Sequence, residues 1–179
     1  MKSRWEITPW TNEWNQKYGI EAELLKAIFQ EEIIEIHHVG STSVPSIGYA
    51  KPIIDILLIV KDVNRVNFYN EPMINLGYRV RGENGIPNRR YFTKGDIPRT
   101  HHVHIYQNND SRILTYLDFK SYLLDHPKEA EDYGHLKLKI LESFSYDEYQ
   151  QEKENRMDNL VERALNWGEL RRNQLLRDG

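Results

Sequence analysis

The spacing of apolar residues predicts an amphipathic helix near the N-terminus. Thr8-Pro9 is a helix start signal, because a capping hydroxyl precedes a proline at the first helical position. Apolar residues then recur at helical spacing along one face: Trp14, Tyr18, Ala22, Leu25 and Phe29. Charged side chains occupy the opposite face. We therefore expect a helix of roughly five turns that packs on the core through its apolar stripe.

The middle of the chain shows strand patterns. Strands are predicted at residues 33–39, 52–60, 78–80, 90–93 and 101–106. The segment 52–60 is apolar on both faces and rich in β-branched residues, which is typical of a buried central strand. After it, Asp62 is expected to cap a helix that runs to about Leu76 and ends at Gly77.

Helical patterns return in the last third of the chain. They cover residues 111–124, 127–143 and 146–166, and the tail 167–179 is expected to fray. No internal repeat or low-complexity linker divides the sequence. We predict one domain over residues 1–179, of the α/β (α+β) class, with a mixed β-sheet, flanking helices and a C-terminal helical segment.

Composition limits the classes of function. The formal net charge of -3 gives no basic excess for neutralising phosphates, so a nucleic-acid partner is not expected. The absence of cysteine excludes disulfides, thiolate catalysis and cysteine-zinc sites. The sequence shows no signal peptide and no apolar run long enough for a membrane span, so we expect a cytoplasmic protein without a membrane partner.

Asp55 interrupts the most apolar strand pattern of the chain. Burial of an unpaired carboxylate costs several kcal/mol, so a partner is expected. One interpretation is a structural hydrogen bond to a loop or to Lys51. The other is that Asp55 faces a cleft and holds a cation. The preceding Gly40-Ser41 turn favours the cation, because small residues let the backbone approach a phosphate closely.

A longer set of motifs surrounds this pair. The segments His38-Val39-Gly40-Ser41-Thr42-Ser43-Val44-Pro45 and Ala50-Lys51-Pro52-Ile53-Ile54-Asp55-Ile56-Leu57 resemble the signature block of the GrpB-like family. Further matching motifs follow in the same order, at residues 76–78, 85–87, 89–92, 99–104, 119–123, 126–127, 133 and 136–137. The resemblance extends from about Trp5 to Leu165.

The resemblance implies the fold of the nucleotidyltransferase (polymerase-beta-like) superfamily. It matches Gly40 and Ser41, followed by Thr42, to the turn that grips the phosphates, and Asp55 to the first metal-binding carboxylate. The superfamily places a second carboxylate two residues later, where this chain has Leu57. This departure argues against a mechanism with two magnesium ions, because one acid does not bridge both.

Histidines on the last predicted strand offer replacement ligands. His102 and His104 share one face, opposite Val103 and Ile105. If this strand neighbours Asp55, the three side chains converge, with Glu83 from a preceding loop nearby. Imidazoles suit zinc, manganese or iron better than magnesium, and protonated histidines also bind phosphate. The alternative is that these histidines only line a polar cleft or bond to the backbone.

Three basic residues are candidates for binding an anionic substrate. Lys51 lies on the loop that leads into the Asp55 strand, and Arg90 and Lys137 match positions typical of the family. Arg89 and Arg90 point to opposite faces if extended, so at most one of them faces the cleft. An ordinary solvated surface charge is the alternative for each.

Two functions follow from these residues. The first is an enzyme that transfers or hydrolyses a nucleotide-type phosphate with a divalent metal (magnesium, manganese or zinc). Its catalytic residues would be Asp55, His104 and Glu83, and its metal ligands Asp55, His102 and His104. The second is a non-catalytic module that binds a nucleotide or a small anionic metabolite, which Leu57 supports directly.

Overall fold

The centre of the molecule is a five-stranded mixed sheet. The computed structural model describes residues 6–145 and 148–178. Within them the strand order is β2-β4-β7-β6-β5. The strands are β2 (Ile33–Val39), β4 (Ile54–Val60), β7 (His101–Gln107), β6 (Arg90–Lys94) and β5 (Tyr78–Val80). Strands β4 and β7 pair in parallel, and the other neighbours pair antiparallel.

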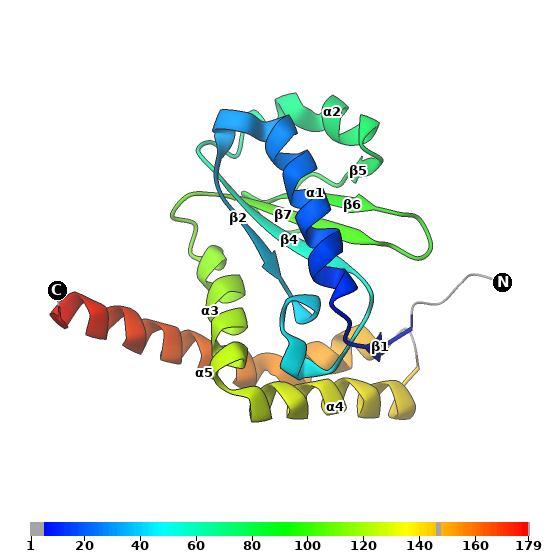
Figure 1. Ribbon diagram of the computed structural model, residues 1–179, viewed down its shortest axis with the longest axis vertical. Coiled ribbons are helices and arrows are strands. Elements are labelled where there is room, and N and C mark those ends of the chain that lie inside the picture. Colours follow the sequence, from blue (N-terminus) through cyan, green and yellow to red (C-terminus); the bar gives the residue numbers. More distant parts are fainter. Residues whose placement is uncertain (1–5, 146–147, 179) are drawn as a thin grey trace.

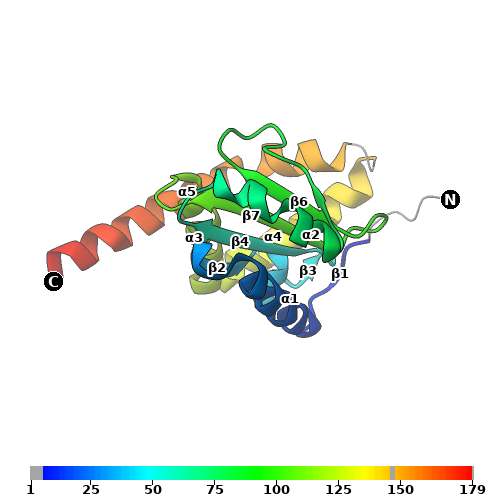
Figure 2. The same cartoon turned by 90° about the horizontal axis from the view of Figure 1, so that it is seen from above.

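One face of this sheet carries the larger apolar cluster. Its side chains, such as Ile56 and Val103, pack against Leu25 and Phe29 of α1 (Glu13–Phe29). The short helices η4 (Arg65–Tyr69) and α2 (Asn70–Asn75) extend the same cluster. Figure 2 shows α1 on one side of the sheet and α5 on the other. This face therefore provides the main core.

The opposite face is divided into two halves. One half is covered by α3 (Arg112–Asp125), which packs Ile113 against Leu57, Ile59 and Tyr106. Helices α4 (Pro127–Ser143) and α5 (Tyr149–Asp178) pack together with α3 and the turn η3 (Pro45–Ile47) (Figure 1). The other half, which carries Asp55, stays free of apolar cover and lines a cavity.

The predicted α/β class with its mixed sheet and C-terminal helices is confirmed, but the N-terminal helix start was wrong. Thr8–Pro9 forms β1, which pairs with β3 (Tyr49–Ala50), and α1 begins only at Glu13. The Trp10 amide extends this ladder by donating to the Gly48 carbonyl at 2.8 Å. The extended pairing takes the place of a first helical turn.

Two other helix boundaries differ from the sequence pattern. After Asp62, whose side chain accepts a bond from the Asn64 amide at 2.8 Å, the chain forms η4 and then α2 instead of one continuous helix. Helix α5 continues through Asp178 where fraying was expected, while positions 146, 147 and 179 lie outside the described residues. Ion pairs with α3 anchor its last turns, since Arg171 contacts Asp125 and Arg172 contacts Asp118, both at 2.6 Å. Within the described ranges, no helix is long and apolar enough to cross a membrane.

Two helical glycines differ sharply in the space around them. A Cβ at Gly134 of α4 would lie 1.8 Å from the backbone oxygen of Ile47, whereas a Cβ at Gly19 of α1 would meet nothing within 4 Å. We expect Gly134→Ala to lower the free energy of unfolding by about 3 kcal/mol, the upper end of overpacking costs, because α4 must move off η3. Gly19→Ala should raise it by about 0.5–1 kcal/mol. Urea unfolding of both variants measures this, and equal effects would contradict the packing described.

Candidate functional site

A cavity of about 990 Å³ opens over the uncovered half of the sheet. Strands β4, β6 and β7 form its floor, and the Gly40–Thr42 turn, α4 and α5 contribute to its walls. Its lining includes lysines and arginines (Lys51, Arg89, Arg99, Lys137 and Lys153), tyrosines (Tyr91, Tyr116, Tyr133 and Tyr149) and two histidines (His102 and His104). Ser41 and Thr42 and the carboxylates of Asp55, Asp96 and Glu154 also line it. We call it the Asp55 cavity.

Asp55 meets both histidines of β7 on this floor. The parallel register sets Asp55 beside His102 and Leu57 beside His104. Asp55 Oδ1 lies 3.1 Å from His102 Nδ1 and 3.5 Å from His104 Nε2. His104 Nδ1 in turn faces the Tyr116 hydroxyl at 3.3 Å. The expected convergence of Asp55, His102 and His104 is therefore present.

The two imidazoles stabilise the ionised carboxylate. Burial acts to raise the pKa of Asp55, but hydrogen bonds and positive charge from His102 and His104 outweigh it and hold the pKa well below its usual range. The other ring nitrogen of His102, Nε2, is buried and has no hydrogen-bond partner among residues 6–145 and 148–178. A buried polar atom without a partner is rare in proteins, and a bound ion or water is one explanation for it.

The same three side chains form a group that fits one metal ion. One ligand atom from each lies within 4.8 Å of the others. Two imidazoles and one carboxylate suit a transition metal such as zinc or manganese, and three protein ligands leave a position open for substrate. Leu57 points to the same face but is fully buried under α3. A second carboxylate in its place would lie in an apolar cluster, outside the cavity.

Gly40 lets the Gly40–Thr42 turn close against Asp55. Its φ of +70° belongs to the region that favours glycine, and a Cβ there would lie 2.6 Å from Asp55 Oδ2. Ser41 lines the cavity next to the Tyr133 phenol. Thr42 is tied into the framework, because its hydroxyl donates to the Ile53 carbonyl at 3.3 Å and lies 2.9 Å from His38 Nε2.

Three lysines lie near one another in the cavity lining. Lys51 and Lys137 lie there as the sequence suggested, and Lys153 of α5 joins them. Lys137 is 4% exposed, donates to the Tyr49 carbonyl at 2.5 Å and lies over the Tyr133 ring. Burial, together with repulsion from Lys153, lowers the pKa of Lys51 and of Lys137 to about 7. Lys153 was missed because it stands in a uniformly polar stretch of helix, where nothing in the sequence singles it out.

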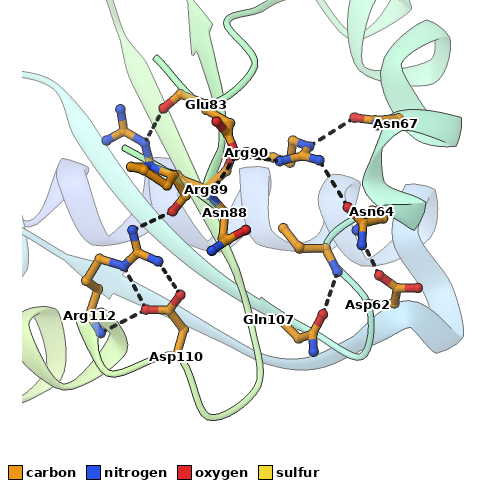
Figure 3. A network of polar contacts seen from close by, with 12 residues as sticks. Asp62, Asn64, Asn67, Glu83, Asn88, Arg89, Arg90, Gln107, Asp110 and Arg112 are labelled. Carbon is orange, nitrogen blue, oxygen red and sulfur yellow. Dashed lines mark hydrogen bonds and ion pairs between the residues drawn. The ribbon is translucent and has the colours of Figure 1, made fainter. Parts of the chain in front are cut away.

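Arg90 and Glu83 do not join the site. Arg90 projects from the other face of β6, where its guanidinium donates to Asn67 Oδ1 at 3.0 Å and to Asn64 Oδ1 at 3.4 Å (Figure 3). The Glu83 carboxylate accepts a bond from the Asn88 amide at 2.7 Å and is half exposed. Neither residue is part of the described cavity lining. Strand alternation instead places Arg89, one residue earlier, on the cavity side.

The comparisons with known proteins show the family of the chain. A family model described as GrpB protein matches residues 4–163. The chain belongs to the GrpB family. Among GrpB-family relatives, YqkA of Bacillus subtilis is 41% identical over 96% of this chain, which spans about half (50%) of YqkA. The glutamate-rich protein GrpB of Alkalihalophilus pseudofirmus is 30% identical over 83% of this chain and 88% of its own length.

Solved structures define the fold. The crystal structure of the conserved protein GrpB from Enterococcus faecalis superposes with a TM-score of 0.84 at 39% identity, covering 90% of this chain and 98% of that one. A cytoplasmic RNA terminal U-transferase superposes with a TM-score of 0.50 at 13% identity, covering 72% of this chain and 41% of that one. This second likeness shows a nucleotidyltransferase-like fold and no more.

The contact between Gly40 and Asp55 gives a first test of the site. We expect Gly40→Ala to weaken zinc or manganese binding by about tenfold or more, because the new methyl group displaces the Asp55 carboxylate. This is the range observed when the groups that orient a metal ligand are disturbed. Gly48→Ala is the control, since Gly48 also has a positive φ (+75°) but open space around it. Calorimetric metal titrations compare the two. Equal metal affinity in both variants would contradict the role assigned to Gly40.

Proposed function

We propose that this GrpB-family chain transfers or hydrolyses a nucleotide-type phosphate with the help of one divalent transition metal. The observation that carries the proposal is the convergence of Asp55, His102 and His104 on the floor of a cavity with cationic walls. Perturbed carboxylate and amine groups that share one cavity are typical of functional sites. The fold of the family is consistent with phosphoryl chemistry, and the residues of the site indicate how this chain would carry out that chemistry.

Each residue group has a role in this proposal. Asp55, His102 and His104 would hold the metal ion, which supplies Lewis-acid stabilisation of charge on the phosphoryl oxygens. Ser41 and the backbone of its turn would orient the phosphate, since small residues allow close approach. Lys51 and Lys137 would neutralise its negative charge. The Tyr116 hydroxyl positions the His104 ring through Nδ1.

The proposal requires one metal ion, because Leu57 offers no second carboxylate and is enclosed by Val39, Ile59, Tyr106 and Ile113. The same observation favours a second candidate function, a module that binds a nucleotide or small anionic metabolite without chemistry. The two candidates share the cavity and its cations. They differ in whether a bound metal ion leads to turnover.

Substituting the metal ligands tests the proposal. Asp55→Asn and His104→Asn should each weaken zinc or manganese binding by about 100-fold or more. Each change removes a metal ligand, which costs more affinity than the loss of a residue that only orients a ligand. His37→Asn is the control, since His37 lies on β2 and contacts Glu35 at 2.7 Å outside the cavity. Metal affinity is measured by calorimetry at neutral pH, with phosphate or nucleotide release followed for a panel of nucleoside triphosphates.

The outcomes separate the candidates. Metal-dependent release that disappears in Asp55→Asn supports the enzyme. Nucleotide binding without release in the metal-loaded wild type identifies the binding module. Metal affinity unchanged in Asp55→Asn would exclude the metal site itself.

A further inference from the structure

Arg89 is a buried cation on the β6 side of the Asp55 cavity. It precedes β6 and is 6% exposed. Its Nε donates to the Glu83 carbonyl at 3.2 Å and one Nη donates to the Asn84 carbonyl at 2.9 Å. Its guanidinium carbon lies 4.7 Å from the centroid of the Tyr91 ring. These contacts fix the orientation of the guanidinium group, and Figure 3 shows the one to Glu83.

Arg89 forms no direct ion pair with a carboxylate in the part of the chain that the structure describes. The backbone carbonyls that it contacts carry no net charge. A buried charge without a partner costs several kcal/mol. The guanidinium has five N–H donors, of which these two bonds use two, so donors remain for a ligand. An oxyanion in the cavity would satisfy both the charge and the donors.

Arg89 and the lysines lie on different sides of the metal-binding group. Lys51 lies on the segment that leads into β4, and Lys137 and Lys153 belong to α4 and α5. Arg89 lies at β6, and β7 with its histidines runs between β4 and β6. The Tyr91 ring links the Arg89 side to the metal-binding group, because it stacks on His104 with centroids 5.0 Å apart. The cavity thus has two cationic regions with Asp55 between them.

We propose that Arg89 forms a second anion subsite, which binds the carboxylate or phosphate of a second substrate while the lysines bind the phosphate chain of the nucleotide. Arginine suits this task, since its planar fork matches both oxyanions in a bidentate manner. The inference rests on the proposed function for the role of the lysines. It adds that the second substrate, which reacts with the nucleotide, is a small anionic molecule.

Sequential binding of two probes tests the subsite without metal or turnover. Metal-free protein is first saturated with inorganic triphosphate, and inorganic phosphate or, in a parallel series, acetate is then titrated in a calorimeter. We expect one of these anions to bind the triphosphate-saturated protein. Arg89→Gln should weaken that binding about tenfold or more, as expected for a lost charged hydrogen bond. The better-bound anion identifies the second substrate as a phosphate or a carboxylate.

Neighbouring residues provide matched controls. Arg90→Gln should leave the second anion's affinity unchanged, because its guanidinium lies on the other face with Asn64 and Asn67. Lys137→Met should weaken triphosphate binding but not the second anion, while Lys139→Met, an exposed position on the same helix, should change neither. Melting temperatures check that each variant is folded. Because Arg89 also ties two loop carbonyls, Arg89→Lys serves as a second variant that keeps the charge without the fork.

Several results would overturn the inference. They are the absence of phosphate and acetate binding to the triphosphate-saturated protein, displacement of triphosphate by either anion, and unchanged anion affinity in folded Arg89→Gln or Arg89→Lys. Asp55→Asn should still bind the second anion. A chain without turnover but with an Arg89-dependent anion site would therefore contradict the proposed enzyme and leave the subsite standing.

Discussion

Asp55 places a carboxylate on an otherwise apolar strand, and the surrounding structure has to stabilise the charge of that carboxylate. Its Oδ1 is held between the imidazoles of His102 and His104, and its Oδ2 packs against the backbone of Gly40. Each contact depends on a particular feature of the chain. The histidines depend on the parallel pairing of β4 with β7, and the close backbone approach depends on a residue without a Cβ. The charge is thereby stabilised by groups that also suit a metal ion and a phosphate.

This constraint divides the second face of the sheet. From Leu57 onward β4 is apolar on that face and α3 covers it, whereas at Asp55 the sheet faces the cavity. Helices α4 and α5 close the far side of the cavity and bring their lysines toward the same space. The first face carries the larger apolar cluster, packed against α1, whereas apolar packing on the second face is confined to the part under α3.

Much of this arrangement follows from local sequence patterns. The strands, α4 and the shared face of His102 and His104 are set by periodicity, and the family motifs around Gly40 and Asp55 point to the floor of the site. Other features depend on contacts between distant segments. Thr8–Pro9 pairs with β3 instead of starting a helix, and the last turns of α5 are held by Asp118 and Asp125 of α3.

The positions of the cationic side chains in the cavity also depend on contacts between distant segments. Strand alternation predicts that only one of Arg89 and Arg90 faces the cavity, but the choice between them depends on the register of β6 against β7. Likewise, Lys153 enters the cavity only because α5 packs where it does, and Glu83 stays outside because its loop bonds to itself through Asn88. A pattern along the chain carries no information on such tertiary placement.

The central claim is that Asp55, His102 and His104 bind a single metal ion, and anomalous diffraction tests it most directly. Crystals soaked in zinc and, separately, in manganese would be measured at the absorption edge of each metal. The account predicts one anomalous peak at about 2.0–2.2 Å from an oxygen of Asp55 and a nitrogen of each histidine. The absence of a peak with both metals, or a pair of peaks about 3.5–4 Å apart, would contradict it.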